Sequence, residues 1–311
     1  MAGYIIRRLL SMIPLLLAVA TLTFFLMHAV PGGPFDISEK TPPAAKKNLE
    51  AKYNLDGPVV DWPWHDSQYR AFMVSLGHGD LGLSIRRNEP VTDILRAGLP
   101  TTVQLGTCAF LFALVVGITL GIVSAVNQNG PLDYLGVFIA TVGVSVPSFV
   151  MAVFLILIFV LQFGWFDVLG WEMWNYRKMV LPTVSLGLLP AAFFARITRA
   201  AMLEVLRQDY IRTARAKGMH ETRVVLRHAA RNALIPVLTV AGPILAGLIT
   251  GSFIIERTFQ IAGIGTTFVD AVGLRDYGLI MGTTLLYAFV IAVMNLIVDI
   301  TYGIADPRIR Y

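Results

Sequence analysis

Residues 204–236 read EVLRQDYIRTARAKGMHETRVVLRHAARNALIP, a strongly basic stretch between two apolar segments. Across all 311 residues, 56% are hydrophobic and only 14% are charged, whereas charged residues make up about 25% of an ordinary soluble domain. This composition excludes an ordinary soluble domain and predicts an all-α integral membrane protein. In such a chain the stretch 204–236 is a polar loop between two membrane-spanning helices.

Apolar runs on either side of this loop predict six membrane-spanning helices. A helix needs about 20 apolar residues to cross a hydrocarbon core of about 30 Å. Runs that meet this need lie at about 9–30, 101–126, 134–161, 179–198, 235–254 and 278–304. The first run is longer than the apolar region of a cleaved signal peptide, so we expect it to be retained as a span.

Residues 31–100 are the one long region without an apolar run of that length. They mix acids, bases, Pro and aromatic residues, and aromatic rings need something to pack against. We therefore expect a small, partly helical external subdomain between the first two spans. The predicted organisation is a tail and first span over 1–30, the subdomain over 31–100, and a five-span core over 101–311 that includes the cytoplasmic loop 199–234.

The distribution of charge predicts the orientation in the membrane. The side shared by both termini and the loop carries thirteen bases, among them Arg308 and Arg310, against five acids. Basic residues concentrate in cytoplasmic segments, so we expect both termini and the loop to be cytoplasmic. The net charge of +5 does not indicate a nucleic-acid partner, because the basic residues lie beside the apolar spans.

Two residues inside spans are candidates for a special role. Pro147 lies at mid-depth in the third span and predicts a kink, which serves either packing or function. Asp299 is the one carboxylate well inside a span, near the cytoplasmic end of the sixth. An ionisable residue at that depth is a functional candidate, and its alternatives are a structural ion pair with Arg196 or Arg199 and direct contact with a substrate.

Catalytic chemistry is not expected from this chain. It lacks the Gly-x-x-x-x-Gly-Lys-Ser/Thr pattern of nucleotide-hydrolysing P-loops. Its five His residues are scattered and form no metal-ligand spacing with acids, so we expect no metal. The single Cys108 allows no disulfide within the chain. A carrier or channel that is driven by an ion gradient and acts without an ATPase remains an alternative, although it predicts more buried acids or His than Asp299 alone.

The loop combines a neutral tip with a cationic stripe. Thr213–Gly218 is rich in small residues, and Gly218 is a natural end for a helix because glycine adopts the left-handed conformation. Such a tip is either a knob that inserts into a groove or an ordinary turn. Because His is a poorer helix N-cap than Ser or Thr, a helix that starts at His220 either frays or is capped by Thr222.

Downstream, Arg223, Arg227 and Arg231 follow one another at intervals of four residues and predict one face of an α-helix. Like charges at this spacing destabilise an isolated helix slightly, so an anionic partner is expected. That partner is either the lipid headgroup layer of the inner leaflet or an acidic pocket on another protein. We interpret the stripe as a lipid or interface brace.

The loop closely resembles the cytoplasmic "EAA" loop of the permease subunits of bacterial oligopeptide and dipeptide ABC importers. The resemblance rests on YIRTARAKG at 210–218, RHA at 227–229 and NALIP at 232–236. It extends over nearly the whole chain, through YIIRRLL at 4–10, GDLGLSI at 79–85, PVTDIL at 90–95, LPTTVQL at 99–105, VPSF at 146–149 and DPRIRY at 306–311.

The resemblance implies a type I ABC importer permease (MetI-like) fold in the bacterial cytoplasmic (inner) membrane. It implies a second homologous permease, two cytoplasmic ATPases that bind ATP and Mg, and an external binding protein that delivers a peptide substrate. This chain itself would bind no cofactor. By the same resemblance the residues that couple to the ATPases are Tyr210, Thr213, Ala214, Arg215, Ala216, Lys217 and Gly218.

Overall fold

The computed structural model describes residues 2–35, 43–53, 55–61 and 67–305. Arg308 and Arg310, together with the DPRIRY motif, lie outside the described residues. Within these ranges the regular secondary structure is helical, apart from an isolated bridge between Leu83 and Pro90. The prediction of an all-α chain is confirmed.

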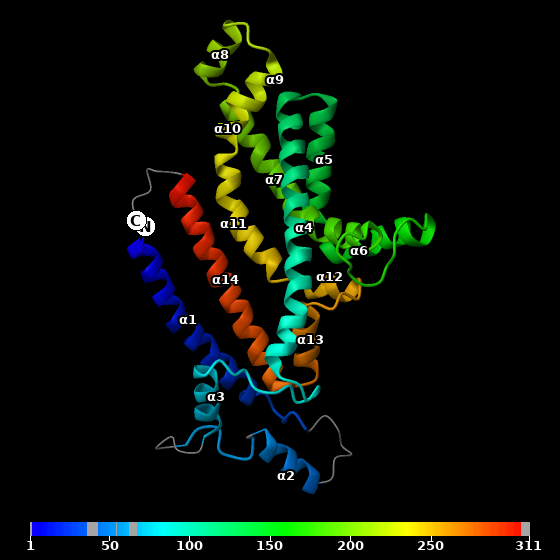
Figure 1. The fold of residues 1–311 in the computed structure, drawn as a ribbon. Coiled ribbons are helices and arrows are strands. Elements are labelled where there is room, and N and C mark those ends of the chain that lie inside the picture. The colour runs from blue at the N-terminus through cyan, green and yellow to red at the C-terminus, as the bar shows by residue number, and fades with distance from the viewer. Residues whose placement is uncertain (1, 36–42, 54, 62–66, 306–311) are drawn as a thin grey trace. The chain divides into compact units, whose positions relative to one another are not determined.

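The chain divides into two compact units, residues 1–101 with 262–293 and residues 102–261 with 294–311. The helices of the first unit are α1 (Ala2–Ala29), α2 (Pro43–Lys52), α3 (Gln68–Gly77), the first turns of α4 (Val91–Val126), α13 (Ile264–Gly273) and most of α14 (Tyr277–Ala305) (Figure 1). Residues 31–100 are partly helical, as predicted, and they share a compact unit with α1 and α13.

A buried carboxylate explains the GDLGLSI motif in the first unit. Asp276 is fully buried at the start of α14 and accepts a hydrogen bond of 3.2 Å from the backbone N–H of Leu279. It also accepts from the Ser84 hydroxyl at 2.6 Å and from the backbone N–H groups of Ile85 and Arg86, both at 3.1 Å. One side chain therefore caps a helix and fixes residues 84–86 against it.

The second unit contains the rest of α4 and the helices α5 (Pro131–Ser145), α6 (Ser148–Leu155), η1 (Ile156–Gln162), α7 (Tyr176–Val205), α11 (Ile235–Ile249) and α12 (Phe253–Thr258), with the loop helices described below. Helix α4 packs closely on α7, since a Cβ atom added at Gly121 would lie 2.7 Å from the carbonyl oxygen of Ala195. Small residues let membrane helices approach in this way.

Six spans are supported by the lengths and composition of these helices. Helices α1, α4, α7 and α14 are each long and apolar enough to cross a membrane. Two bent pairs, 131–145 with 148–162 and 221–233 with 235–249, complete the six if each pair is counted as one span; in the second pair only 235–249 lies in the predicted fifth span, and 221–233 belongs to the loop. Helix α4 begins ten residues before its apolar run, because hydropathy detects only the apolar part of a helix.

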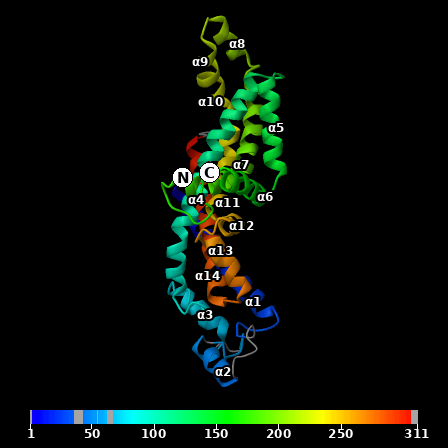
Figure 2. The ribbon, with the colours of Figure 1, turned by 90° about the vertical axis from the view of Figure 1, so that its right-hand side faces the viewer.

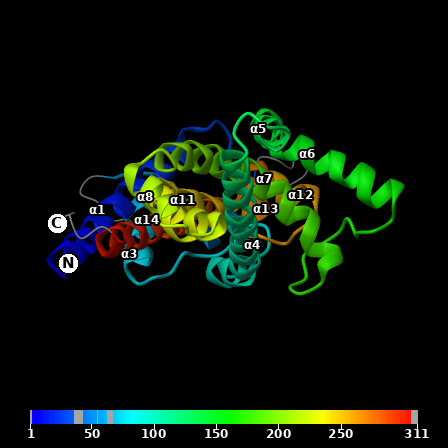
Figure 3. The ribbon, with the colours of Figure 1, turned by 90° about the horizontal axis from the view of Figure 1, so that it is seen from above.

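The kink predicted at Pro147 is a break of 109° between α5 and α6. Val146 is extended, with φ −94° and ψ 121°, because the proline ring disfavours the α conformation in the residue before it. Figure 3 shows α6 leaving the direction of α5. Ala152 of α6 is fully buried in a cluster that includes Leu181 of α7 and Ile255 of α12.

Candidate functional site

The loop between α7 and α11 folds into two short helical arms. The first arm is α8 (Asp209–Ala216), and the second is a continuous run of α9 (Glu221–Arg223), η2 (Val224–Ala229) and α10 (Ala230–Ala233). Both arms extend past the ends of α4 and α5 (Figure 2). The loop is therefore a structured projection of the second unit.

Helix α8 is held against the second arm by an apolar face. Ile211 is fully buried and Ala214 is 7% exposed, and both pack in a cluster with Met202 of α7 and with Val224 and Ala229 of η2. The other face of α8 is open to solvent, because Asp209, Tyr210, Arg212, Thr213, Arg215 and Ala216 are exposed. A small apolar core, formed with α7 and η2, therefore holds α8 in place and leaves its other face exposed.

Gly218 ends α8 as predicted, with φ +75°. Its N–H donates to the carbonyl of Arg215 at 2.9 Å, and the next N–H, of Met219, donates to the carbonyl of Ala214 at 3.3 Å. These two bonds form a Schellman motif, which satisfies carbonyls at the helix end. Met219 also packs against the cluster that contains Ala214, so the turn between the arms is a defined structure.

Two pairs of polar side chains join the two arms. The Arg215 guanidinium pairs with the Glu221 carboxylate at 2.6 and 3.1 Å, and this hydrogen-bonded partner raises the pKa of Arg215. The Asn232 amide donates to the Tyr210 hydroxyl at 2.8 Å. His220 caps the second arm itself, since its Nδ1 accepts from the backbone N–H two residues on at 3.3 Å. The sequence predicted that this helix start either frays or is capped by Thr222; in the structure the His220 imidazole is the N-cap instead.

One member of the predicted tip differs from the others in burial. Six of the seven residues predicted to couple to the ATPases are exposed, namely Tyr210, Thr213, Arg215, Ala216, Lys217 and Gly218. Ala214 is buried within the loop, because it lies three residues after Ile211 and so shares its inner face on a helix. Ala214 therefore packs within the loop, and its predicted part in coupling stays a prediction.

The cationic stripe has the exposure that a brace requires, since Arg223, Arg227 and Arg231 are all exposed. The segment that carries them is not a regular α-helix, because η2 lies between the first and the last of them and its hydrogen bonds run from i to i+5. Their role as a brace stays a prediction.

An ion pair that the sequence did not indicate lies near the loop. Arg199 of α7 binds Asp133 of α5 through both Nε and Nη2, each at 2.7 Å. The Asp133 side chain is 3% exposed and also accepts from the Ser124 hydroxyl of α4. This contact ties together the ends of α4, α5 and α7 that lie nearest the loop, ten residues before α8 begins.

The predicted pairing of Asp299 with Arg196 or Arg199 stays a prediction. Arg199 is engaged by Asp133, and Arg196 is exposed on α7. Asp299 is half-buried in α14. Pro131 marks the first turn of a helix, where an acid such as Asp133 is favoured, but this pattern does not identify Arg199 as its partner.

The profile of the family described as binding-protein-dependent transport system inner membrane component matches residues 117–311, and the profile of its N-terminal region matches residues 1–106. The chain belongs to this family. Among curated relatives, it is 42% identical to the dipeptide transport system permease protein DppB of Bacillus subtilis, over 100% of this chain and 98% of that protein. It is 41% identical to the oligopeptide transport system permease protein OppB of Haemophilus influenzae, over the full length of both.

Solved structures confirm the fold of this permease. An inward-facing methionine ABC transporter, MetNI, aligns with a TM-score of 0.57 and 20% identity over 68% of this chain and 96% of its own. An amino acid ABC transporter with histidines aligns with a TM-score of 0.53 and 17% identity over 68% of this chain and 94% of its own. The type I ABC importer permease fold predicted from the sequence is therefore confirmed, and the chain is a multi-pass component of the inner membrane.

Proposed function

We propose that this chain forms half of the translocation pathway of an ATP-driven importer of dipeptides or oligopeptides. The observation that carries the proposal is the loop between α7 and α11, whose α8 is exposed on one face and fixed on the other by Ile211. The relatives named as dipeptide and oligopeptide permeases, which match over the full length, support the class of substrate.

The exposed face of α8 docks on one of two cytoplasmic ATPase subunits. ATP and Mg bind to those partners, and this chain supplies no nucleotide chemistry. When ATP closes the ATPase pair, α8 moves with it, and the movement passes to α7 and α11, between which the loop is inserted. Nucleotide thus shifts the population between inward-open and outward-open states by a hinge-type motion.

The Asp133–Arg199 pair extends that movement to further helices. Because Arg199 lies on α7 and Asp133 and Ser124 lie on α5 and α4, a displacement of the α7 end is shared by three helices. A closely packed contact of this kind passes on a displacement because it deforms little. Arg223, Arg227 and Arg231 brace the second arm against anionic lipid or the ATPase surface.

The remaining parts of the importer are a second, homologous permease and an external binding protein that delivers the peptide. The loop and both termini lie in the cytoplasm, which the excess of basic residues on that side supports. Asp299 acts in assembly or in contact with the peptide.

Co-purification and transport assays test the proposal together. The tagged chain should recover two ATPase subunits and a second permease, and proteoliposomes containing them should accumulate dipeptide only with ATP and the binding protein. Uptake by the chain alone, driven by a proton or sodium gradient, would instead establish the ion-gradient carrier. That outcome would refute the proposal.

A further inference from the structure

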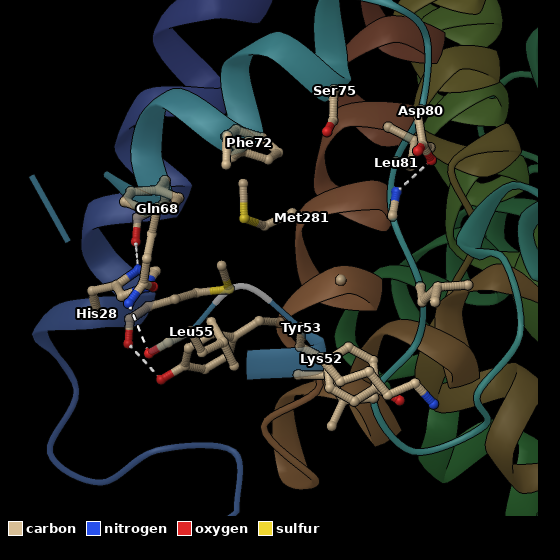
Figure 4. Close-up of a pocket in the computed structure, with 18 residues that line it drawn as sticks. His28, Lys52, Tyr53, Leu55, Gln68, Phe72, Ser75, Asp80, Leu81 and Met281 are labelled. Carbon is tan, nitrogen blue, oxygen red and sulfur yellow. Dashed lines mark hydrogen bonds between the residues drawn. The ribbon is translucent and has the colours of Figure 1, made fainter. Parts of the chain in front are cut away.

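The first unit contains a cavity of about 300 Å³. Its wall is formed by the end of α1, the end of α2, α3, residues 80–85 and the start of α14 (Figure 4). Pockets that bind small molecules usually measure about 300–1,000 Å³. The cavity therefore lies at the lower end of this range and has the size of a site for a small molecule.

One side of the cavity is apolar and can adapt its shape. Phe24 and Met27 of α1 and Met281 of α14 are buried in one cluster, and Phe72 of α3 packs against it. All four line the cavity. Methionine side chains are unbranched and polarizable, so they adjust to apolar groups of different shapes. This side of the cavity suits an apolar side chain of a ligand.

The polar amide beside this cluster is engaged within the protein. The Gln68 Nε2 donates to the carbonyl oxygens of Leu55 and Gly57 at 3.0 and 2.7 Å. Its Oε1 lies 2.9 Å from a ring nitrogen of His28. These contacts fix the position of the wall between α1 and α3, so the cavity is held in shape by the protein itself.

Two exposed groups of opposite charge line the same cavity. They are Lys52 at the end of α2 and Asp80 after α3, and Figure 4 shows them at separate places on the wall. The Lys52 ammonium donates to Oδ1 of Asn88 at 2.7 Å, and the Asp80 carboxylate accepts from the backbone N–H of Gly82 at 2.8 Å.

Both charged groups keep capacity for a ligand. An ammonium group has three N–H donors, and a carboxylate has about four acceptor sites. A bond to Asn88 and a bond from Gly82 use only part of this capacity. An apolar wall with an ammonium and a carboxylate beside it is complementary to a molecule that carries both charges and an apolar group.

We propose that this cavity binds a short zwitterionic peptide with an apolar side chain. The ammonium of the peptide pairs with Asp80, its carboxylate pairs with Lys52, and its apolar side chain lies against Phe72, Met27 and Met281. The inference rests on the proposed function, which supplies the peptide and the external position of residues 31–100, and it gives that external region a peptide site of its own.

The methyl groups of Met27 and Met281 report directly on the occupancy of the cavity. The full-length chain, with the subunits that co-purify with it, is labelled with ¹³C-methyl methionine in lipid nanodiscs. The two signals are assigned as those missing from Met27→Leu and Met281→Leu. We expect both signals to shift saturably with leucyl-leucine, in the absence of ATP and binding protein. Signals that do not respond to leucyl-leucine would overturn the proposal.

Further probes identify the chemistry that the cavity recognises. Glycyl-glycine, which lacks apolar side chains, and N-acetyl-leucyl-leucine amide, which lacks both charges, should bind more weakly than leucyl-leucine. Tighter binding of free leucine would assign the cavity to amino acids and contradict the peptide assignment. A single-chain fatty acid that shifts the two signals when leucyl-leucine does not would make the cavity a lipid site.

Variants test the two charged contacts. Asp80→Asn and Lys52→Gln should each weaken the binding of leucyl-leucine by about threefold to fivefold, the effect of an exposed ion pair. Asp61→Asn and Lys47→Gln are matched controls, because both residues are exposed and do not line the cavity. These controls should leave the binding unchanged. Binding that is equally unaffected by Asp80→Asn and Lys52→Gln would refute the recognition of a zwitterion.

The outcome for the cavity can be separated from the outcome for the importer. Occupancy is measured without ATP, whereas transport is measured as ATP-dependent uptake in proteoliposomes. Methyl shifts without ATP-dependent uptake would refute the proposed importer and keep the binding site. Uptake of leucyl-leucine without methyl shifts would refute the binding site alone.

Discussion

Gly218 determines the shape of the turn between the two arms of the loop. Its φ of +75° lies in the left-handed region, where a β-branched residue is strained by about 1–2 kcal/mol. We predict that Gly218→Val distorts the Schellman turn and lowers ATP-dependent uptake several-fold, with basal ATP hydrolysis retained. The measurement is uptake per ATP hydrolysed in proteoliposomes that contain the assembled importer.

Gly79 provides a matched control for that substitution. Its φ is +76°, and neither at Gly79 nor at Gly218 would an added Cβ atom meet another atom within 4 Å. Gly79→Val therefore introduces a similar backbone strain at a residue of the first unit, which is not part of the loop. If the two variants lose coupling equally, the effect is general destabilisation and the role assigned to the loop tip is wrong.

The Asp133–Arg199 ion pair should contribute more to stability than an exposed ion pair does. Asp133→Asn leaves the Arg199 guanidinium without its anionic partner. We expect the free energy of unfolding to fall by roughly 2–4 kcal/mol. This lies toward the lower end of the range for buried ion pairs, because the Arg199 side chain is 29% exposed. Asp209→Asn, in an exposed pair with Arg212, should cost less than about 1 kcal/mol. Thermal unfolding in detergent compares the two variants.

A double-mutant cycle separates this pair from the alternative partner. Arg199→Gln should show a large coupling energy with Asp133→Asn and almost none with Asp299→Asn. A strong coupling to Asp299 instead would mean that the pair seen in the structure is not the one that stabilises the protein.

Sequence patterns reveal single residues only where local geometry determines their role. Gly218 was predictable because a helix end needs a left-handed residue. Asp133 was not, because its partners Arg199 and Ser124 come from helices whose pairing the sequence does not state. Ala214 was assigned to the exposed tip because resemblance identifies a motif and does not tell which side of a short helix is buried.

At the scale of elements, the break between α5 and α6 is held by packing as well as by Pro147. Ala152 of α6 is fully buried against α7 and α12, so the bend survives without the proline. We predict that Pro147→Ala leaves the distance between spin labels at Tyr134 and Leu161 unchanged, on a Cys108→Ala background. Both label sites are exposed.

A straight helix would give a very different result. Twenty-seven residues separate the two labels, and at 1.5 Å per residue they would be about 40 Å apart along one axis. If Pro147→Ala shifts the measured distance toward that value, the proline alone maintains the break.

The spans themselves were predictable, because long apolar runs must become helices in lipid, where backbone groups have no water to bind. The break at Pro147 was also predictable, because proline cannot continue a regular helix. The π-helical turn at 224–229 was not, since no residue type in VVLRHA distinguishes it from an α-helix.

At the scale of the whole molecule, the proposed orientation predicts which residues an impermeant reagent reaches. On a Cys108→Ala background, single cysteines at Lys217 and at Trp174, both exposed, should be labelled from opposite sides of the membrane. In intact cells the Trp174→Cys variant should react and the Lys217→Cys variant should react only after permeabilisation. The reverse pattern would place the loop outside the cell and contradict the topology.

The composition and the motifs spread along the chain were sufficient to predict the helical membrane architecture and the family. The division of the chain into two compact units could not be predicted in this way. Residues 31–100 join α1 and 262–293 in one unit through contacts such as Ser84 with Asp276, which lie 192 residues apart. Contacts over such separations cannot be inferred from one sequence without knowledge of the fold.

In the proposed importer, the exposed face of α8 docks on an ATPase subunit. The most direct test of this docking is site-specific photocrosslinking in cells, with the crosslinking residue at Thr213 or Ala216, which are exposed, and at Ala214, which is buried. We predict adducts with an ATPase subunit from Thr213 and Ala216 and none from Ala214. If Thr213 and Ala216 yield only lipid adducts or none in the assembled importer, α8 is not the docking element and the account is wrong.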